Sequence, residues 1–301
     1  MESPEGWWNL HAGVIMGSFK EIINTISNPT ILFTSVLIIF PFVFPPSDWF
    51  EKWHRKLGLH HLWGTKAIII AMVGMIAFFI YGLGDYNFQK IVLKPDNVPI
   101  SGMIFLVVFF TWLAMYQAYK NDERLDAGQK PDEFYEAPND KVLVWPDLVY
   151  VELISLIIMS AFLLVWSIGL PAPIEEPANP TESPNPAKAP WYFLGLQEML
   201  VYFDPWMAGV VLPSLIIVAL MAMPYIDRNS ENSGFYSYKR RRLAISLYMF
   251  GWLVLWQLLI IVGTVLRGPN WNFFGPFEYW DVHKLEAVSY THLTLPTNRE
   301  V

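Results

Sequence analysis

Histidine and cysteine, the residues that hold most redox metals in proteins, are sparse in this sequence. The 301 residues contain no cysteine, which excludes disulfides, iron–sulfur ligation and thioether attachment of haem on these residues. The histidines all lie outside the long apolar runs: His11, His54, His60, His61, His283 and His292. A haem inside a membrane bundle needs axial histidines within the spanning helices. We therefore expect this chain alone to hold no haem.

Three of these histidines share one short basic loop. His54, His60 and His61 lie beside several lysine and arginine residues, and only Glu51 is near enough in sequence to complete a metal-binding set. A metal site and solvated loop side chains are the two interpretations. The shortage of carboxylates favours solvated side chains, and we expect no metal site.

Two carboxylates stand among apolar residues. Glu152 lies one turn into an apolar run, where an ionisable side chain is a functional candidate, although the lipid headgroups are also within its reach. Glu198 lies among Leu196, Met199 and Leu200, and a carboxylate in such surroundings suits a proton acceptor. The alternative for Glu198 is that it points to water or pairs with a partner subunit.

The segment that carries Glu198 follows a proline-rich loop. Prolines recur from Pro171 to Pro190 and prevent a regular helix there, whereas residues 191–203 contain none. A proline is well tolerated in a first helical turn. The pattern predicts a short, mostly apolar helix over residues 190–203, lying at a membrane surface outside the main bundle.

The rest of the chain has the composition of a membrane protein. Hydrophobic residues make up 54% of the sequence and charged residues 16%, against about 25% charged in soluble domains. Apolar runs of roughly the length needed to cross a bilayer predict an all-α polytopic protein with about six transmembrane helices. The runs are 30–46, 66–84, 101–119, 147–170, 207–226 and 243–266.

Basic residues are unevenly divided between the two sides of these helices. The loops after the first, third and fifth runs, with Lys66 at the start of the second run, hold 13 lysines and arginines, against 6 on the opposite side before residue 286. The positive-inside rule places the richer side in the cytoplasm. Both termini, and the loop from Pro171 to Pro205, are then expected on the outer side. Nothing in the composition resembles a nucleic-acid-binding protein.

The chain divides into three parts by composition. Residues 1–140 form a three-helix membrane region of unknown role, ending in a charged linker over residues 121–140. Residues 141–285 form a second three-helix region. Residues 286–301 differ sharply in composition from the residues before them and resemble translated sequencing-adapter read-through, so we expect a non-native tail there.

Residues 141–282 resemble a known family. The loop reads Glu176-Pro177-Ala178-Asn179-Pro180 and leads into Pro190-Trp191-Tyr192 at the spacing seen in the C-terminal half of cytochrome b and in subunit IV of related complexes. The upstream Trp145-Pro146-Asp147-Leu148 also resembles the entry to the first helix of that half. Residues 1–140 resemble no family that we can name.

The resemblance implies a quinol-oxidation site on the outer face. Trp191 and Tyr192 match residues that form one wall of the family's pocket, and Pro190 and Leu194 complete the quinol-binding set that we expect. Pro190 stands where the family has a glutamate that is thought to accept a proton from the quinol. Glu198 lies two helical turns further on, about 10 Å along the axis, and is the candidate substitute acceptor.

The resemblance also implies partners and a location. We expect a non-haem membrane subunit of a bc-type quinol:cytochrome c oxidoreductase in the bacterial cytoplasmic membrane. Its partners would be a haem-bearing cytochrome b-like subunit, a Rieske iron–sulfur protein and a c-type cytochrome. The alternative is a structural scaffold subunit of an electron-transfer complex, with a degenerate quinol site.

Overall fold

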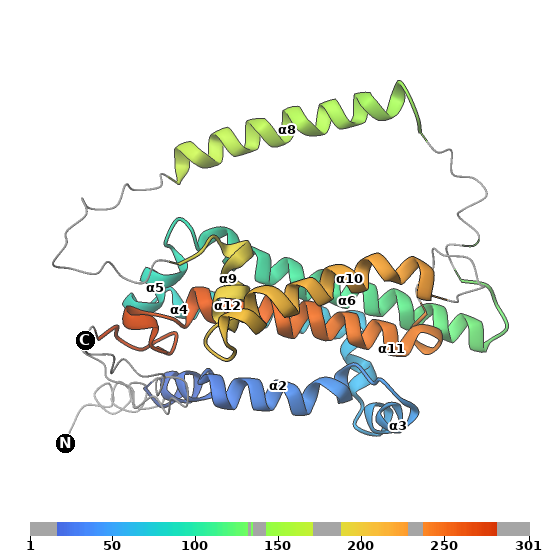
Figure 1. Cartoon of the computed structure of the whole chain (residues 1–301), viewed down its shortest axis with the longest axis horizontal. Helices are drawn as coiled ribbons and strands as arrows, with labels where there is room; N and C mark the ends of the chain where they lie inside the picture. The colour runs from blue at the N-terminus through green and yellow to red at the C-terminus, as the bar shows by residue number, and fades with distance from the viewer. Residues whose placement is uncertain (1–16, 132–133, 135–142, 171–187, 228–236, 282–301) are drawn as a thin grey trace, which may run out of the picture.

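The computed structural model describes residues 17–131, 134, 143–170, 188–227 and 237–281 (Figure 1). Within these residues the chain is all-α, with one isolated β-bridge between Arg267 and Phe273. Five helices are long and apolar enough to cross a membrane, or six if one bent pair counts as a single span. The predicted polytopic all-α fold is confirmed. The predicted tail at 286–301 lies outside the described residues.

The first apolar run lies in a bent pair of helices. A helix over Gly17–Ile26 meets α2 (Pro29–Val43) at an angle of 68°. Asn28 caps α2 by accepting a hydrogen bond from the backbone N–H of Thr30, and Pro29 occupies the first helical turn. Because α2 has only 15 residues, it needs the preceding helix to reach the length of a full span.

Two short helices fill the loop that follows. The short basic loop of the sequence analysis contains α3 (Asp48–Lys56) and the 3₁₀ turn η1 (Leu59–Trp63). Between them Gly58 adopts a φ of 70°, a left-handed conformation that suits glycine. The chain then rises through α4 (Thr65–Gly82) and the short α5 (Tyr86–Val92).

Helix α6 (Val98–Asp126) returns antiparallel to α4. The indole N–H of Trp112 donates to the carbonyl of Gly64 at 3.2 Å, and this hydrogen bond fixes the axial offset between α6 and the start of α4. The predicted linker over residues 121–140 begins too early, because α6 continues to Asp126. The last turns of α6 are held by Ser237 and Lys239, which contact Asp122 and Asp126.

Helix α8 (Asp147–Gly169) stands apart from the other helices in Figure 1. All its residues are exposed to the surroundings of the chain. Its apolar composition, with the highest mean hydropathy of the five spans at 2.5, requires a lipid or protein cover.

The remaining elements build the second helical region. After the loop helix α9 (Trp191–Met199), one span runs through the π-helical η3 (Met207–Val211) into α10 (Leu212–Ile226). The last span joins three segments end to end: α11 (Tyr238–Met249), the π-helical η4 (Phe250–Leu258) and α12 (Leu259–Val265). A 3₁₀ turn, η5 (Pro269–Trp271), follows.

The bundle therefore has two ends of different character. At one end α3, η1, the end of α6 and the start of α11 meet around Trp63, Met115 and Tyr238; we call this the basic end. At the other end α9 lies against η3 and α12 around Met199, Ala208 and Leu259; we call this the α9 end. The described members of the two groups of basic residues that the sequence distinguishes lie at these opposite ends. Which end faces the cytoplasm stays a prediction.

Candidate functional site

The entry to α9 is fixed by a proline and a glutamine. Pro190 occupies the N-cap position with extended backbone angles, and the backbone N–H of Ala189 donates to the side-chain oxygen of Gln197 at 2.7 Å. The helix is shorter than the predicted 190–203, since residues 200–203 form turns. Asp204 then caps the next helix through the N–H groups of Trp206 and Met207.

Trp191 and Tyr192 form an aromatic edge at the start of α9. Their ring centroids are 5.6 Å apart in a T-shaped arrangement, and Tyr192 also contacts the ring of Phe193 at 4.8 Å. Trp191 is 44% exposed and Tyr192 is 46% exposed. The two predicted wall residues are therefore in contact with each other and open to a ligand or a partner.

The opposite face of α9 packs against the last span. Leu194 is buried, and a Cβ built on Gly263 of α12 would lie 3.0 Å from the Leu194 Cγ atom. A Cβ on Gly195 would lie 3.5 Å from Ile260 and from the carbonyl of Trp256. Glycine at both positions lets the helices approach closely. Leu194 therefore anchors α9 to α12, on a face different from that of the exposed aromatic edge.

Glu198 lies on this buried face and is 0% exposed. Its carboxylate accepts three hydrogen bonds from the guanidinium of Arg267, at 2.7, 3.1 and 3.2 Å. The hydroxyl of Tyr202 donates a further hydrogen bond to it at 2.9 Å. The sequence offered water or a partner subunit as its alternative contacts, whereas the structure gives Glu198 an ion pair within the chain.

Arg267 follows the end of α12 and its side chain is 7% exposed. Its guanidinium also donates to the carbonyl of Trp271 at 3.0 Å, which ties the turn η5 to the cluster. Burial disfavours the charged guanidinium, but hydrogen bonding and attraction from Glu198 outweigh it and hold the pKa of Arg267 above its ordinary value. The guanidinium therefore stays charged and is well hydrogen-bonded to Glu198.

Lys188 anchors the end of the proline-rich loop to the same place. Its ammonium donates to the carbonyls of Thr264 and Arg267 at 2.9 and 2.8 Å and lies 5.8 Å from the centre of the Trp280 ring. Burial, with a smaller contribution from the charge of Lys94, lowers the pKa of Lys188 to about 8. Two unpaired carbonyls at the end of the last span are thereby satisfied.

Sequence reasoning missed the residues that hold Glu198 and the entry to α9 in place. Arg267, Tyr202, Lys188 and Gln197 come from three different segments, and only folding brings them together. One signal was available for Arg267, which is a lone basic residue directly after an apolar run. A basic residue at that position is also typical of a membrane anchor, so the sequence did not predict its ion pair with Glu198.

Glu152, the other predicted carboxylate, forms no hydrogen bond or ion pair with the described residues of this site. It is exposed on α8, together with every other residue of that helix. The structure therefore brings it to none of the residues at the α9 end.

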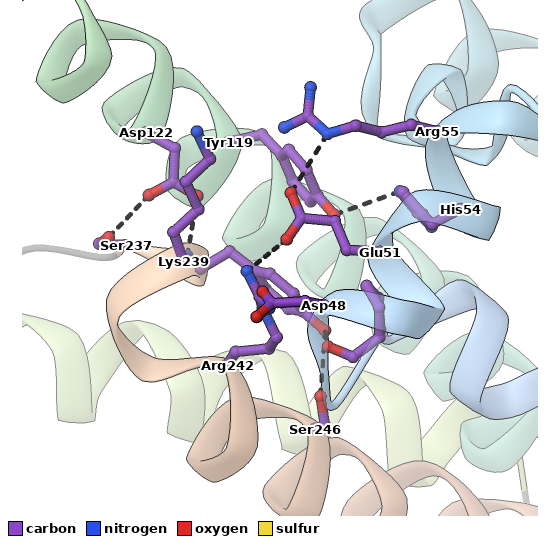
Figure 2. Close-up of polar contacts among 12 residues, drawn as sticks. Asp48, Glu51, His54, Arg55, Tyr119, Asp122, Ser237, Lys239, Arg242 and Ser246 are labelled. Carbon is purple, nitrogen blue, oxygen red and sulfur yellow. Dashed lines mark hydrogen bonds and ion pairs between the residues drawn. The ribbon is translucent and has the colours of Figure 1, made fainter.

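A second polar cluster lies at the basic end (Figure 2). His54 is 0% exposed there: its Nδ1–H donates to the carbonyl of Phe42 at 2.7 Å, and its Nε2 accepts from the hydroxyl of Tyr119 at 3.2 Å. The interpretation of the loop histidines as solvated is wrong for His54, because α3 folds back beneath the end of α2. Burial lowers the pKa of His54.

The same cluster joins the two predicted halves of the chain. Arg242 of α11 forms ion pairs with Asp48 and Glu51 of α3, and Asp122 of α6 accepts hydrogen bonds from Ser237 and the backbone of Lys239 (Figure 2). Among the described residues no group of three histidine, cysteine or acidic side chains is arranged to hold a metal ion.

Comparisons with known proteins give the site its context. The chain is 30% identical over 122 residues to the menaquinol:cytochrome c reductase cytochrome c subunit of Geobacillus thermodenitrificans, and 28% identical over 124 residues to that of Bacillus subtilis (strain 168). Each alignment covers 38% of this chain and 48% of the relative, so the chain spans about half the length of these relatives. No solved structure matches the chain.

A family description matches the part of the chain that carries α9. Residues 177–276, about a third of the chain, match the family cytochrome b(C-terminal)/b6/petD. This range contains Trp191, Tyr192, Glu198 and Arg267, and so includes both the aromatic edge and the buried ion pair. The resemblance of the second helical region to the C-terminal half of cytochrome b is thus confirmed over residues 177–276.

Proposed function

We propose that this chain is a non-haem membrane subunit of a bc-type quinol:cytochrome c oxidoreductase that contributes the outer-face quinol-oxidation site. The observation that carries the proposal is the exposed aromatic edge of Trp191 and Tyr192, at the start of a helix within the family match. The relatives are named as subunits of menaquinol:cytochrome c reductases, which supports a quinol as the substrate class.

The aromatic edge suits the quinol ring. A quinol is flat and apolar with two hydroxyl groups, so aromatic walls with a few hydrogen-bonding groups recognise it. Trp191 and Tyr192 would supply the wall, and the Tyr192 hydroxyl a hydrogen bond. Pro190 fixes the direction in which the chain enters the helix, while Leu194 holds the helix against α12.

Oxidation of a quinol to a quinone releases two electrons and two protons. In this proposal the electrons pass to a Rieske iron–sulfur protein and to a haem-bearing cytochrome b-like subunit, with a c-type cytochrome as a further partner. The chain handles one of the protons: Glu198 accepts hydrogen bonds from Arg267 and from the hydroxyl of Tyr202. We propose Glu198 as the acceptor, reached from the quinol through Tyr202 or water.

A structural scaffold is the second candidate function. Two observations favour it: proline replaces the family's glutamate at position 190, and Glu198 is fully buried in an ion pair. In that case the chain would only hold its partners in place. The expected location, a bacterial membrane complex with both termini outside, is the same for both candidate functions.

Tyr192→Ala tests the proposed site. Tyr192 lies on an exposed face and contributes little to the bundle, so the complex should assemble normally while quinol turnover falls several-fold and KM for quinol rises. Tyr225→Ala is the matched control, because Tyr225 is 90% exposed at the other end of the bundle. Equal quinol titration curves for wild type and Tyr192→Ala would favour the scaffold.

A further inference from the structure

The segment after η5 folds back over the end of the last span. We call residues 272–281 the strap. At its start the N–H of Phe274 donates to the carbonyl of Leu266 at 2.9 Å, and the N–H of Gly268 donates to the carbonyl of Asn272 at 3.0 Å. The Phe274 side chain is 0% exposed, and a Cβ built on Gly268 would lie 2.6 Å from its ring. The start of the strap is therefore fixed to the end of α12.

The first half of the chain holds the middle of the strap. Asn24, in the helix over Gly17–Ile26, accepts a hydrogen bond from the N–H of Phe277 at 3.1 Å through its side-chain oxygen. A Cβ built on Gly275 would lie 2.3 Å from the same oxygen, so only glycine fits there. The ring of Phe277 is buried and stacks on Phe88 of α5, with centroids 5.3 Å apart and an interplanar angle of 18°.

The two elements that hold the strap are also joined to each other. Asp85 caps α5 by accepting hydrogen bonds from two backbone N–H groups of its first turn, and its carboxylate pairs with Lys20 of the N-terminal helix. The Lys20 ammonium also lies 5.7 Å from the centre of the Phe277 ring. The helix over Gly17–Ile26 and α5 therefore form one unit, which we call the platform.

The strap leads from the platform to the residues that hold α9. Near its end, the Trp280 ring lies 5.8 Å from the ammonium of Lys188, which fixes the end of the proline-rich loop. Directly before the strap, the carbonyl of Trp271 accepts a hydrogen bond from Arg267, the partner of Glu198. Trp271 has a φ of 58°, a left-handed conformation that is costly for a residue other than glycine, so its neighbours must hold this turn in place.

We infer that the platform positions α9 and its aromatic edge through the strap. Asn24 and Phe88 are then positioning residues, because they fix the strap that contacts Lys188 and Arg267. The platform lies outside the family match over residues 177–276, so the inference gives this part of the chain a role at the family site. Its meaning for catalysis rests on the proposed quinol site, because α9 carries that site.

Gly275→Ala tests the inference in the whole purified complex, because the added methyl group would displace the strap from Asn24. Hydrogen exchange of the backbone amides over residues 188–199 should rise. The KM for quinol should rise about five-fold while kcat stays nearly unchanged, since the quinol must then order the aromatic side chains as it binds.

Two further variants make the test specific. Gly102→Ala is the matched control, since it adds the same methyl group near the start of α6, where nothing lies within 4 Å, and it should match wild type in both measurements. Asn24→Ala creates no clash and removes only the acceptor of the Phe277 N–H. It should therefore assemble and raise exchange over residues 188–199 by less, and it decides the test if Gly275→Ala fails to assemble.

The two measurements separate the inference from the proposed function. Unchanged exchange over residues 188–199 in Gly275→Ala and Asn24→Ala would overturn the inference. An equal rise in distant helices such as α11 would also overturn it, because it would indicate a general loss of stability. Raised exchange confined to the strap and α9, with an unchanged KM, would support the positioning role and contradict a quinol site at the aromatic edge.

Discussion

At the residue scale, Glu198 and Arg267 form a buried ion pair, so substituting Glu198 changes both stability and any role in catalysis. Removing one partner leaves the other charge uncompensated, which costs about 3–5 kcal/mol in typical buried pairs. A substitution of Glu198 therefore alters stability whatever its catalytic role. The response of turnover to pH separates the two effects, because only a titrating acceptor gives turnover an acidic limb.

Glu198→Gln keeps the shape of the side chain and removes the charge. If Glu198 accepts the quinol proton, turnover should fall several-fold and the acidic limb of its pH profile should disappear. The double variant Glu198→Gln/Arg267→Gln removes both charges, so it should regain thermal stability without regaining the limb. Normal turnover across the acidic range in Glu198→Gln would assign the proton to another group.

His54 makes stability depend on pH at the other end of the bundle. Its folded pKa lies below the ordinary value of 6.5, so the folded state favours the neutral ring that bonds to Phe42 and Tyr119. The stabilisation from the neutral ring is complete above pH 6.5 and is lost as the pH falls through the lowered pKa. Other groups facing the ring are His60, Glu51 and Arg55, whose charges partly offset one another.

We therefore expect the Tm of the wild-type complex to fall between pH 7 and pH 5 more steeply than that of His54→Gln. His61→Gln, which changes an exposed histidine of the same loop, is the control and should keep the wild-type slope. Identical slopes in all three proteins would mean that acidification acts elsewhere.

At the scale of elements, α9 depends on a close approach to α12. Leu194 fits against Gly263, where a Cβ would come within 3.0 Å of its Cγ atom. Gly263→Val should displace α9, lower turnover and increase amide exchange over residues 191–199. Gly74→Val is the control: it changes helix propensity by the same amount, but nothing lies within 4 Å of a Cβ there. Unchanged exchange in Gly263→Val would show that α9 docks by other contacts.

The sequence predicts the existence of α9 better than its orientation. Proline density followed by an uninterrupted apolar run locates the helix, because proline excludes helix before the run begins. The run is apolar on all sides, so its pattern does not select the face that carries Leu194 and Glu198. That choice depends on Gly263 and Arg267, which are 69 residues away from them, and on the Tyr202 hydroxyl in the turn that follows.

Similar reasoning explains the other elements. Hydropathy locates the long spans, because a bilayer demands about twenty apolar residues from any helix that crosses it. Hydropathy does not predict the short helices α3 and η1, because they are polar on one side. Tertiary contacts such as those of Arg242 and His54 hold them in place. Arg242 lies 191 residues from Glu51, and no local sequence pattern predicts such a contact.

At the scale of the whole molecule, the two ends of the bundle predict a direction in the membrane. The basic end carries α3 and the start of α11, and the positive-inside rule places it in the cytoplasm. The α9 end, with Trp191 and Tyr192, then faces outward, as outer-face quinol oxidation requires. Helix α8 is exposed along its whole length, and in the proposed complex its apolar surface would be covered by lipid or by the partner subunits.

The absence of cysteine from the sequence allows a clean test of this direction. Asp96→Cys places a thiol on an exposed turn at the α9 end, and Gln129→Cys places one just after α6 at the basic end. In intact cells a membrane-impermeant maleimide should label Asp96→Cys at once, and Gln129→Cys only after permeabilisation. Wild type should remain unlabelled throughout. The reverse pattern would put the aromatic edge on the cytoplasmic side, and would contradict both the topology and the outer-face quinol site.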